Sequence, residues 1–166
     1  MQPVLRRGER VVVDVWTTLW RKPRVGDIVL YDPQALTIET PDGNIAIVNP
    51  RSAIERVVAA PGQTFEHRNG QFYRDGKQVP PDQQPLVQNQ VFWDFSITVP
   101  QDRWLVLFTY TGEEWVPVAG TVRAPRLDTP GWFVRGFNEA SLVERDKIQG
   151  IVRWVYQPPV ARRVLH

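Results

Sequence analysis

Hydrophobic and polar positions alternate over short runs along most of the chain, and turn-forming residues separate the runs. Alternation with a period of two is typical of half-buried strands, whereas an amphipathic helix repeats every 3.6 residues. We therefore expect strands at residues 10–15, 28–31, 54–59 and 151–159, and two short strands on either side of a turn at residues 100–102. The best helical candidate, residues 141–150, is only a turn or two long. The pattern predicts an all-β domain with short helices.

Glycine-containing dipeptides lie between several of these runs. Asp42-Gly43 separates two alternating runs, which is the strongest short-range hairpin signal. Asn69-Gly70 and Asp75-Gly76 indicate further tight turns, because Asn, Asp and Gly tolerate a positive φ. Residues 79–90 are polar and proline-rich, so we expect a surface loop there.

The chain length and the apolar content fit one domain with a real core. No repeat or linker divides the 166 residues, so we predict a single domain over residues 1–166, with an insertion or β-ribbon around 64–131. The net charge of only +2 implies no strong field, and we expect no nucleic-acid partner. The expected core residues are Val11, Val13, Val15, Ile28, Leu30, Ile54, Val57 and Val152.

The residue inventory excludes several kinds of chemistry. The chain has no cysteine and only two histidines, His67 and His166, so we expect no metal site and no cofactor. A Ser-His-Asp triad would need His67, which we expect to be an exposed hairpin residue. None of its three candidate serines, Ser52, Ser96 and Ser141, lies in a nucleophile elbow. No glycine-rich phosphate loop is present either.

Five segments occur in a definite order along the chain. They read MQPVLRRGERVVVD, RVGDIVLYD, IERVVAAPGQTFEHRNGQFYRDGKQV, ITVPQDRWLVL and VERDKIQGIVRWVYQP. This order resembles the type I signal peptidase (leader peptidase) family over Met1 to Pro158. The positions that match its first three motifs are Met1, Pro3, Leu5, Gly8 and Glu9, then Gly26, Asp27, Ile28 and Val29, then Arg56, Val57, Pro61 and Gly62. The resemblance implies a signal-peptidase-like fold, a twisted and partly closed antiparallel β domain.

The positions that carry the family's chemistry depart from its pattern. The resemblance places the serine nucleophile just before Met1, outside this chain, and the lysine base at the position of Glu55. A Ser/Lys dyad works because desolvation keeps the lysine neutral, so that it can accept the serine proton. The family's third signature is also eroded, with Phe108, Thr109 and Tyr110 in one alignment and Phe137 in another. We therefore predict a catalytically inactive homologue.

The resemblance also predicts where a ligand would lie. It implies a groove formed by Met1, Gln2, Pro3, Glu55 and Val57 that holds a protein segment in extended conformation. Because neighbours on a strand point to opposite faces, Arg56 cannot neutralise Glu55 directly. We expect Glu55 either to pair with another cation or, the favoured alternative, to face water in the groove.

Three readings of the function remain open. The first is a non-catalytic signal-peptidase-like module that binds or assembles with an extended protein segment. The second is the extracytoplasmic fragment of a membrane-anchored type I signal peptidase, a serine endopeptidase that lacks its nucleophile here. The third is an unrelated small β-barrel binding module. No apolar run reaches the ~20 residues of a membrane helix, so membrane attachment and an extracytoplasmic location depend on an anchor before Met1.

Overall fold

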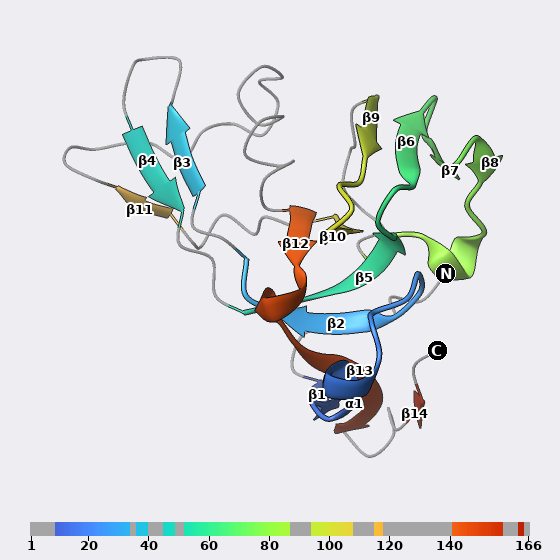
Figure 1. Cartoon of the computed structure of the whole chain (residues 1–166). Helices are drawn as coiled ribbons and strands as arrows, with labels where there is room; N and C mark the ends of the chain where they lie inside the picture. The colour runs from blue at the N-terminus through green and yellow to red at the C-terminus, as the bar shows by residue number, and fades with distance from the viewer. Residues whose placement is uncertain are drawn as a thin grey trace.

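The part of the protein that the structure describes is built mainly of antiparallel strands, as a computed structural model shows (Figure 1). The structure describes residues 9–33, 52–86, 94–107 and 141–157, together with the strand segments 36–39, 45–48, 115–117 and 163–164. The strands are β1 Arg10–Asp14, β2 Ile28–Tyr31, β3 Leu36–Glu39, β4 Ile45–Val48, β5 Ala53–Ala59, β6 Thr64–Arg68, β7 Gln71–Arg74, β8 Lys77–Gln78, β9 Phe95–Thr98, β10 Arg103–Val106, β11 Trp115–Pro117, β12 Leu142–Glu144, β13 Ile148–Gln157 and β14 Arg163–Val164. The helical turns are α1 Thr17–Trp20 and the 3₁₀ turns η1 Pro81–Gln83 and η2 Arg145–Lys147. The predicted all-β class is confirmed.

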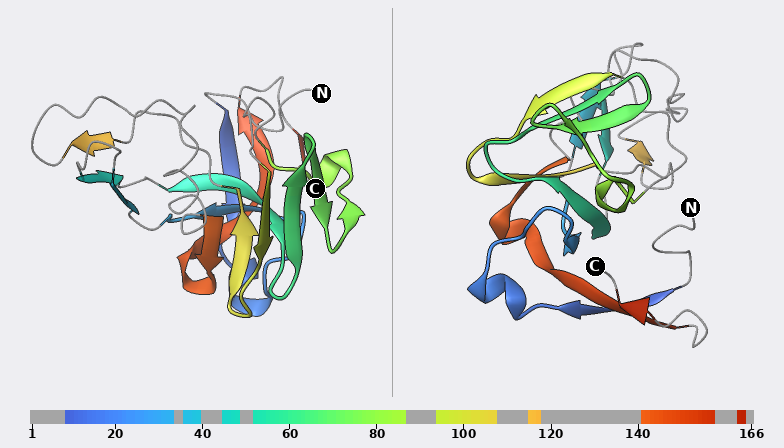
Figure 2. Two further views of the ribbon diagram at one scale, coloured as in Figure 1. Left: turned by 90° about the horizontal axis from the view of Figure 1, so that it is seen from above. Right: turned by 90° about the vertical axis from the view of Figure 1, so that its right-hand side faces the viewer.

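The largest sheet has seven strands and carries most of the matched motifs. Its order is β1-β13-β2-β5-β10-β12, and β14 pairs with the far half of β13. Strand β13 is long enough to pair with β2 at its start and with β1 at its end, and register shifts in both ladders let it bend between them (Figure 2). The remaining strands form a three-stranded sheet, β11-β4-β3, and a four-stranded sheet, β8-β7-β6-β9.

The core consists of two clusters on opposite faces of the central strands. One cluster includes Val29, Val57 and Trp104, and the other joins β5 and β10 to the four-stranded sheet through Val58, Phe65 and similar residues. Among the predicted core residues, Ile28, Val57 and Val152 are fully buried, whereas Val11, Val13, Leu30 and Ile54 are half-buried. Val15 is 49% exposed, so that prediction was wrong, because β1 ends at Asp14 and the chain turns outward.

Local turn chemistry is confirmed in the described hairpins. Asn69 and Asp75 have φ values of 51° and 50°, and the glycines that follow them, Gly70 and Gly76, also have a positive φ, 74° in both. The antiparallel pair β3–β4 agrees with the hairpin expected at Asp42-Gly43, although the turn itself lies outside the described residues. The surface-loop prediction for 79–90 was wrong at Val79, which is 2% exposed and packs in the second cluster.

The helical prediction for residues 141–150 was wrong. This segment forms β12, the 3₁₀ turn η2 and the start of β13. Val143 and Ile148 are buried in the first core cluster, and strand pairing places both of them there. Of the charged residues between them, Glu144 ends β12, and Arg145, Asp146 and Lys147 form the connecting turn η2. The division into one domain with an insertion at 64–131 stays a prediction.

Candidate functional site

Strand β5 contains the position where the sequence motif implies a catalytic base. It lies in the middle of the seven-stranded sheet, between β2 and β10. Its pattern of β-branched residues suits this place, because a central strand is covered on both faces. Backbone bonds join Val57 to the turn before β2: Gly26 N donates to Val57 O at 2.8 Å, and Val57 N donates to Asp27 O at 2.8 Å. The second and third matched motifs are therefore physically joined.

Glu55 lies on the face of β5 that contributes to the first core cluster. It is paired with Val29 across the β2–β5 ladder, and Ala53 is paired with Tyr31. Because directly opposed residues share a face, Glu55 lies beside the buried side chains of Val29, Tyr31 and Val57. Only 5% of Glu55 is exposed. The favoured expectation that Glu55 faces water was wrong, since strand β2 and the surrounding cluster cover it.

Arg56 is buried on the opposite face of the same strand. It is 4% exposed, and its Nη1 donates to the carbonyl oxygen of Gln84 at 3.0 Å. Burial lowers the pKa of Arg56 from its ordinary value, and the charge of Asp82 opposes that change. The guanidinium therefore holds the segment around η1 against β5, on the face away from Glu55. This agrees with the expectation that Arg56 does not neutralise Glu55 directly.

The structure describes only part of the predicted groove. Met1, Gln2 and Pro3 lie outside the described residues, so their distance from Glu55 stays a prediction. Val57 is fully buried and paired with Val106, so its side chain belongs to the core and forms no exposed wall. The two alternative positions of the third signature, residues 108–110 and 136–138, also lie outside the described residues.

The three serines weighed as alternative nucleophiles are placed far from triad geometry. Ser52 Oγ donates to Asp32 Oδ1 at 2.7 Å, and Ser141 is completely buried. Ser96 is paired with Glu66 in the β6–β9 ladder. His67 follows Glu66 on β6, so the side chains of Ser96 and His67 lie on opposite faces of this sheet. No triad is formed from these residues.

His67 itself is not the exposed hairpin residue that the sequence suggested. Only 6% of it is exposed, and its ring lies 4.8 Å from that of Phe72 and 6.0 Å from that of Phe95. Asp94 Oδ1 lies 3.7 Å from its Nδ1. The ring packing explains the burial, because both phenylalanines come from strands that pair with β6.

None of the three lysines stands at β5. Lys22 follows α1 and is exposed, Lys77 is exposed on β8, and Lys147 closes η2 with its Nζ 4.0 Å from Asp146 Oδ2. Within the described residues no group of three or more metal-ligating side chains comes together. In the same part of the chain, no helix is long and apolar enough to cross a membrane.

Comparison with known proteins agrees with the order of the motifs. The family described as "Signal peptidase, peptidase S26" matches residues 1–107, which include β5 and the segments before it. The chain belongs to this family. It is therefore a signal-peptidase-I-like domain, and the fold named from the sequence is confirmed.

Individual relatives match parts of this domain. The protein named "Probable signal peptidase I-1" from Synechocystis sp. is 40% identical over 78 residues, which cover 46% of this chain and 37% of that protein. The "Thylakoidal processing peptidase 1, chloroplastic" of Arabidopsis thaliana is 32% identical over 73 residues, covering 44% and 21%. The "Inactive signal peptidase IA" of Staphylococcus aureus strain Mu50 is 30% identical over 97 residues, covering 58% and 45%. The chain spans less than half the length of these curated relatives.

A solved structure is also similar. The signal peptidase I of Enterococcus faecalis V583 is 19% identical, with a TM-score of 0.43, and the match covers 79% of this chain and 97% of that one.

Sequence reasoning missed two residues of the site. Tyr31 contributes a buried ring and hydroxyl to the face of Glu55, and Gln84 provides the carbonyl that binds Arg56. The first could have been found by pairing β2 with β5, because both strands were predicted. The second has no local signal, since it depends on how the chain folds back after the hairpins.

Proposed function

We propose that this domain is a non-catalytic member of the signal peptidase family that binds an extended protein segment. The observation that carries the proposal is the buried carboxyl group of Glu55 at the position where the resemblance implies the lysine base. A Ser/Lys dyad depends on an amine that can lose its charge and reach the serine hydroxyl. Glutamate offers a group of opposite charge on a shorter side chain, so the family's mechanism has no base here.

The scaffold around that position is retained. Gly26, Asp27 and Val57 still join the second motif to the third through backbone hydrogen bonds. A sheet that keeps its strands and loses its base is suited to hold an extended segment by strand addition at an edge. The strand β1 is such an edge, because it pairs only with β13 in the described part of the chain.

A second candidate function is favoured by a separate observation. The 40% identity to a Synechocystis protein named as a signal peptidase supports a peptidase role for the longer protein. On that alternative, the chain is the extracytoplasmic part of a membrane-anchored serine endopeptidase. Glu55 argues against it, unless a different group serves as the base.

One experiment separates the two. The chain is incubated with a labelled preprotein that carries an Ala-x-Ala site, and both cleavage and binding are measured, the latter by fluorescence anisotropy. We expect binding without cleavage. Specific cleavage would overturn the proposal, and cleavage that survives Ser52→Ala, Ser96→Ala and Ser141→Ala would show that none of these serines is the nucleophile. Absence of both activities would also overturn it.

An engineered variant tests the reason. Adding a serine before Met1 together with Glu55→Lys supplies both residues of the Ser/Lys dyad. We expect little activity from this variant, because the third signature that supports the lysine is eroded. The matched control is the added serine with Glu55→Gln, which removes the carboxylate charge and supplies no amine. Strong cleavage by the lysine variant and not by the glutamine control would show that Glu55 prevents catalysis once the serine is present, and would favour the peptidase alternative.

A further inference from the structure

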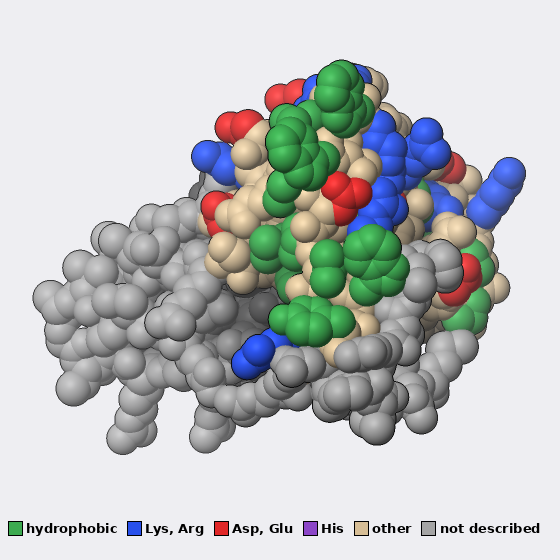
Figure 3. All heavy atoms as spheres, turned by 90° about the horizontal axis from the view of Figure 1, so that it is seen from below, with side chains coloured by type: hydrophobic (Ala, Val, Ile, Leu, Met, Phe, Trp, Pro, Cys, Tyr) green, Lys and Arg blue, Asp and Glu red, His purple; other side chains and the backbone are tan. Residues whose placement is uncertain are grey.

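Strand β9 forms one edge of the four-stranded sheet, and β6 is its partner among the described strands. Its sequence is Phe95-Ser96-Ile97-Thr98, and its ladder with β6 runs without a register shift. Figure 1 shows β9 at the end of the molecule opposite α1, away from the apolar side chains that Figure 3 shows on the underside. An open strand edge offers a row of backbone donors and acceptors to another chain, so proteins usually protect such edges.

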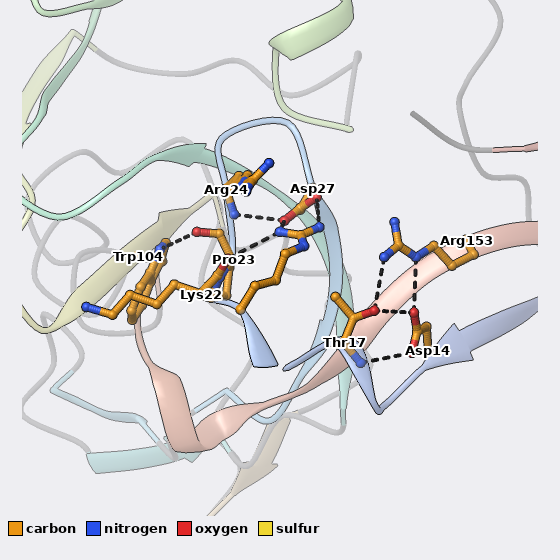
Figure 4. Close-up of polar contacts among 9 residues, drawn as sticks. Asp14, Thr17, Lys22, Pro23, Arg24, Asp27, Trp104 and Arg153 are labelled. Carbon is orange, nitrogen blue, oxygen red and sulfur yellow. Dashed lines mark hydrogen bonds and ion pairs between the residues drawn. The ribbon is translucent and has the colours of Figure 1, made fainter. Parts of the chain in front are cut away.

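The other edge strands in the described part of the chain carry such protection. A charge or a proline on an edge strand opposes pairing with another chain. Strand β1 also has register shifts against β13, and its Asp14 is held by Thr17 and Arg153 (Figure 4). Among these edges, β9 alone has no charged residue, proline or register shift. The protecting residues of the others are Arg10 and Asp14 on β1, Glu39 on β3, Lys77 on β8, Pro117 on β11, Glu144 on β12 and Arg163 on β14.

The outward backbone groups of β9 belong to Ser96 and Thr98. Val99 N donates to Gln63 O at 2.9 Å, so the backbone of Val99 faces the β6 side. The direction of the N–H and C=O groups alternates along a strand, so the groups of Thr98 and Ser96 point away from β6. Both residues are exposed.

A hydrogen bond on β6 supports this direction. Thr64 is paired with Thr98, but its carbonyl oxygen accepts from Asp75 N at 2.8 Å, on the side of β7. Thr64 and Thr98 are therefore an antiparallel pair whose backbone groups point away from each other. Their hydroxyl oxygens lie 3.1 Å apart across the ladder.

The two faces of β9 differ in polarity. Ile97 is 7% exposed in the second core cluster, and Phe95 is half-buried and packs at the border of that cluster. Ser96 and Thr98, on the other face, are small, uncharged and exposed. A strand that extends the sheet at this edge needs apolar residues toward the cluster and small polar residues outward. The sequence of β9 itself has this alternation.

We propose that β9 pairs with β9 of a second copy of this chain, antiparallel about a twofold axis at Ile97. In this register Ser96 opposes Thr98 of the partner subunit, so the outward donors and acceptors of both residues are used. Phe95 opposes Val99 of the partner subunit, which continues the second core cluster across the axis. A twofold interface places the same patch on both copies, and on β9 no charge meets its own image. The two four-stranded sheets become one continuous sheet.

The occupant is argued from this self-complementarity. A foreign segment would need the alternation of apolar and small polar residues, whereas a second copy has it in its own β9. The ladder is short, so we expect a dimer of the transient class, which buries less than about 1,200 Å². The dimer goes beyond the proposed binding of a protein segment and does not depend on it.

Sedimentation velocity of the whole chain at rising protein concentration tests the pairing and its register. Ser96→Lys with Thr98→Lys places like charges opposite each other on both sides of the axis, and should weaken dimerisation about tenfold. Ser96→Lys with Thr98→Glu places a lysine opposite a glutamate at the same positions, and should restore dimerisation to within about threefold of the native chain. A register that set Ser96 against itself would keep lysines opposed in both variants.

A matched control adds the same charge elsewhere on the outer face of this sheet. Gln71→Lys with Gln78→Lys changes exposed residues of β7 and β8, and should leave dimerisation unchanged. Circular dichroism spectra of all variants should match, which separates loss of pairing from loss of folding. Hydrogen exchange followed by NMR gives a second readout. The amides of Ser96 and Thr98 should become protected as the dimer forms, whereas that of Ile97, which faces β6, should not change.

Three results would overturn the proposal. The first is a monomer at every concentration. The second is an equal loss of dimerisation in the lysine–lysine and lysine–glutamate variants, because the proposed register then does not occur. The third is protection of the Ser96 and Thr98 amides in the monomer, because another part of the same chain would then pair with this edge.

Discussion

The middle of the seven-stranded sheet and its lower edge depart from ordinary burial in opposite directions. At the middle, Glu55 and Arg56 are buried although charged residues are seldom fully buried. At the edge, Trp16 and Trp20 are exposed although large aromatic rings usually pack inside. Departures of this kind concentrate where a protein is shaped by function as well as by stability.

The two departures differ in what surrounds them. Arg56 has a hydrogen-bond partner inside the protein, the Gln84 carbonyl oxygen, so its burial is compensated in part within the fold, while its Nε makes no hydrogen bond within the described residues. The tryptophans of the edge have only solvent over most of their surface. The buried charge of Arg56 is therefore part of the packing of the fold. The exposed rings of Trp16 and Trp20 contribute little to that packing. We expect substitutions in the interior to lower stability, and substitutions of Trp16 or Trp20 to leave the free energy of unfolding nearly unchanged.

The largest expected effect is at Arg56. Arg56→Ala should lower the free energy of unfolding by about 2–4 kcal/mol, because it removes a buried charged hydrogen bond and leaves a space and a bare carbonyl group. Urea denaturation measures the change. The control Arg68→Ala removes an exposed guanidinium that lies 4.0 Å from the ring centre of Tyr73 and should cost less than about 1 kcal/mol. Equal losses would remove the distinction between interior and surface charges.

A smaller effect is expected at Gly150, where the interior meets the edge. A Cβ atom there would lie 2.5 Å from Val13 Cγ1 and 3.0 Å from the Asp14 carbonyl oxygen. Gly150→Ala should therefore push β1 away from β13 and cost about 1–3 kcal/mol. Asp146→Ala, an exposed change in the preceding turn, should stay within about 0.5 kcal/mol. A native-like stability for Gly150→Ala would mean that β1 can move away from β13 at little cost in free energy.

The strands that were easiest to predict from sequence are the central ones. Residues 28–31 were predicted with the bounds that the structure has, and β5 was predicted one residue short. Residues 28–31 are apolar, residues 54–59 are apolar except for Glu55 and Arg56, and both runs end at a turn or a proline, so local pattern and strand position agree. Residues 141–150 were predicted as a short helix, but burial of Val143 and Ile148 through strand pairing decided the outcome. Propensity is a weak guide when tertiary packing opposes it.

The role of Glu55 as a site residue stays a prediction, and its environment was not predicted from the sequence. Glu55 lies on β5, and its burial depends on Val29 and Tyr31, which reach it only through the β2–β5 ladder. The exposed apolar residues at the lower edge of the sheet show the same limit. They come from β1, α1 and β13, and no single segment reveals that they share one surface. Alternation predicts strands, whereas the neighbours of a face follow from the pairing.

The smallest expected effect concerns Asp14, whose contacts with Thr17 and Arg153 hold the turn between β1 and α1. Hydrogen bonds from the Thr17 side chain and backbone hold the pKa of Asp14 below its ordinary value of 3.8, and Arg153 acts in the same direction. A lowered carboxyl pKa contributes stability above the ordinary value, and this contribution is lost as the pH falls through the lowered pKa of the folded state. Asp14→Asn should therefore be less stable than the native chain at neutral pH, and the difference should shrink below about pH 4. Urea midpoints measured from pH 7 to pH 3 give this difference. Asp146→Asn is the control, because Asp146 is exposed and its contact with Lys147 spans 4.0 Å. A difference that stays constant with pH would show that Asp14 supports the turn through its shape and not through its charge.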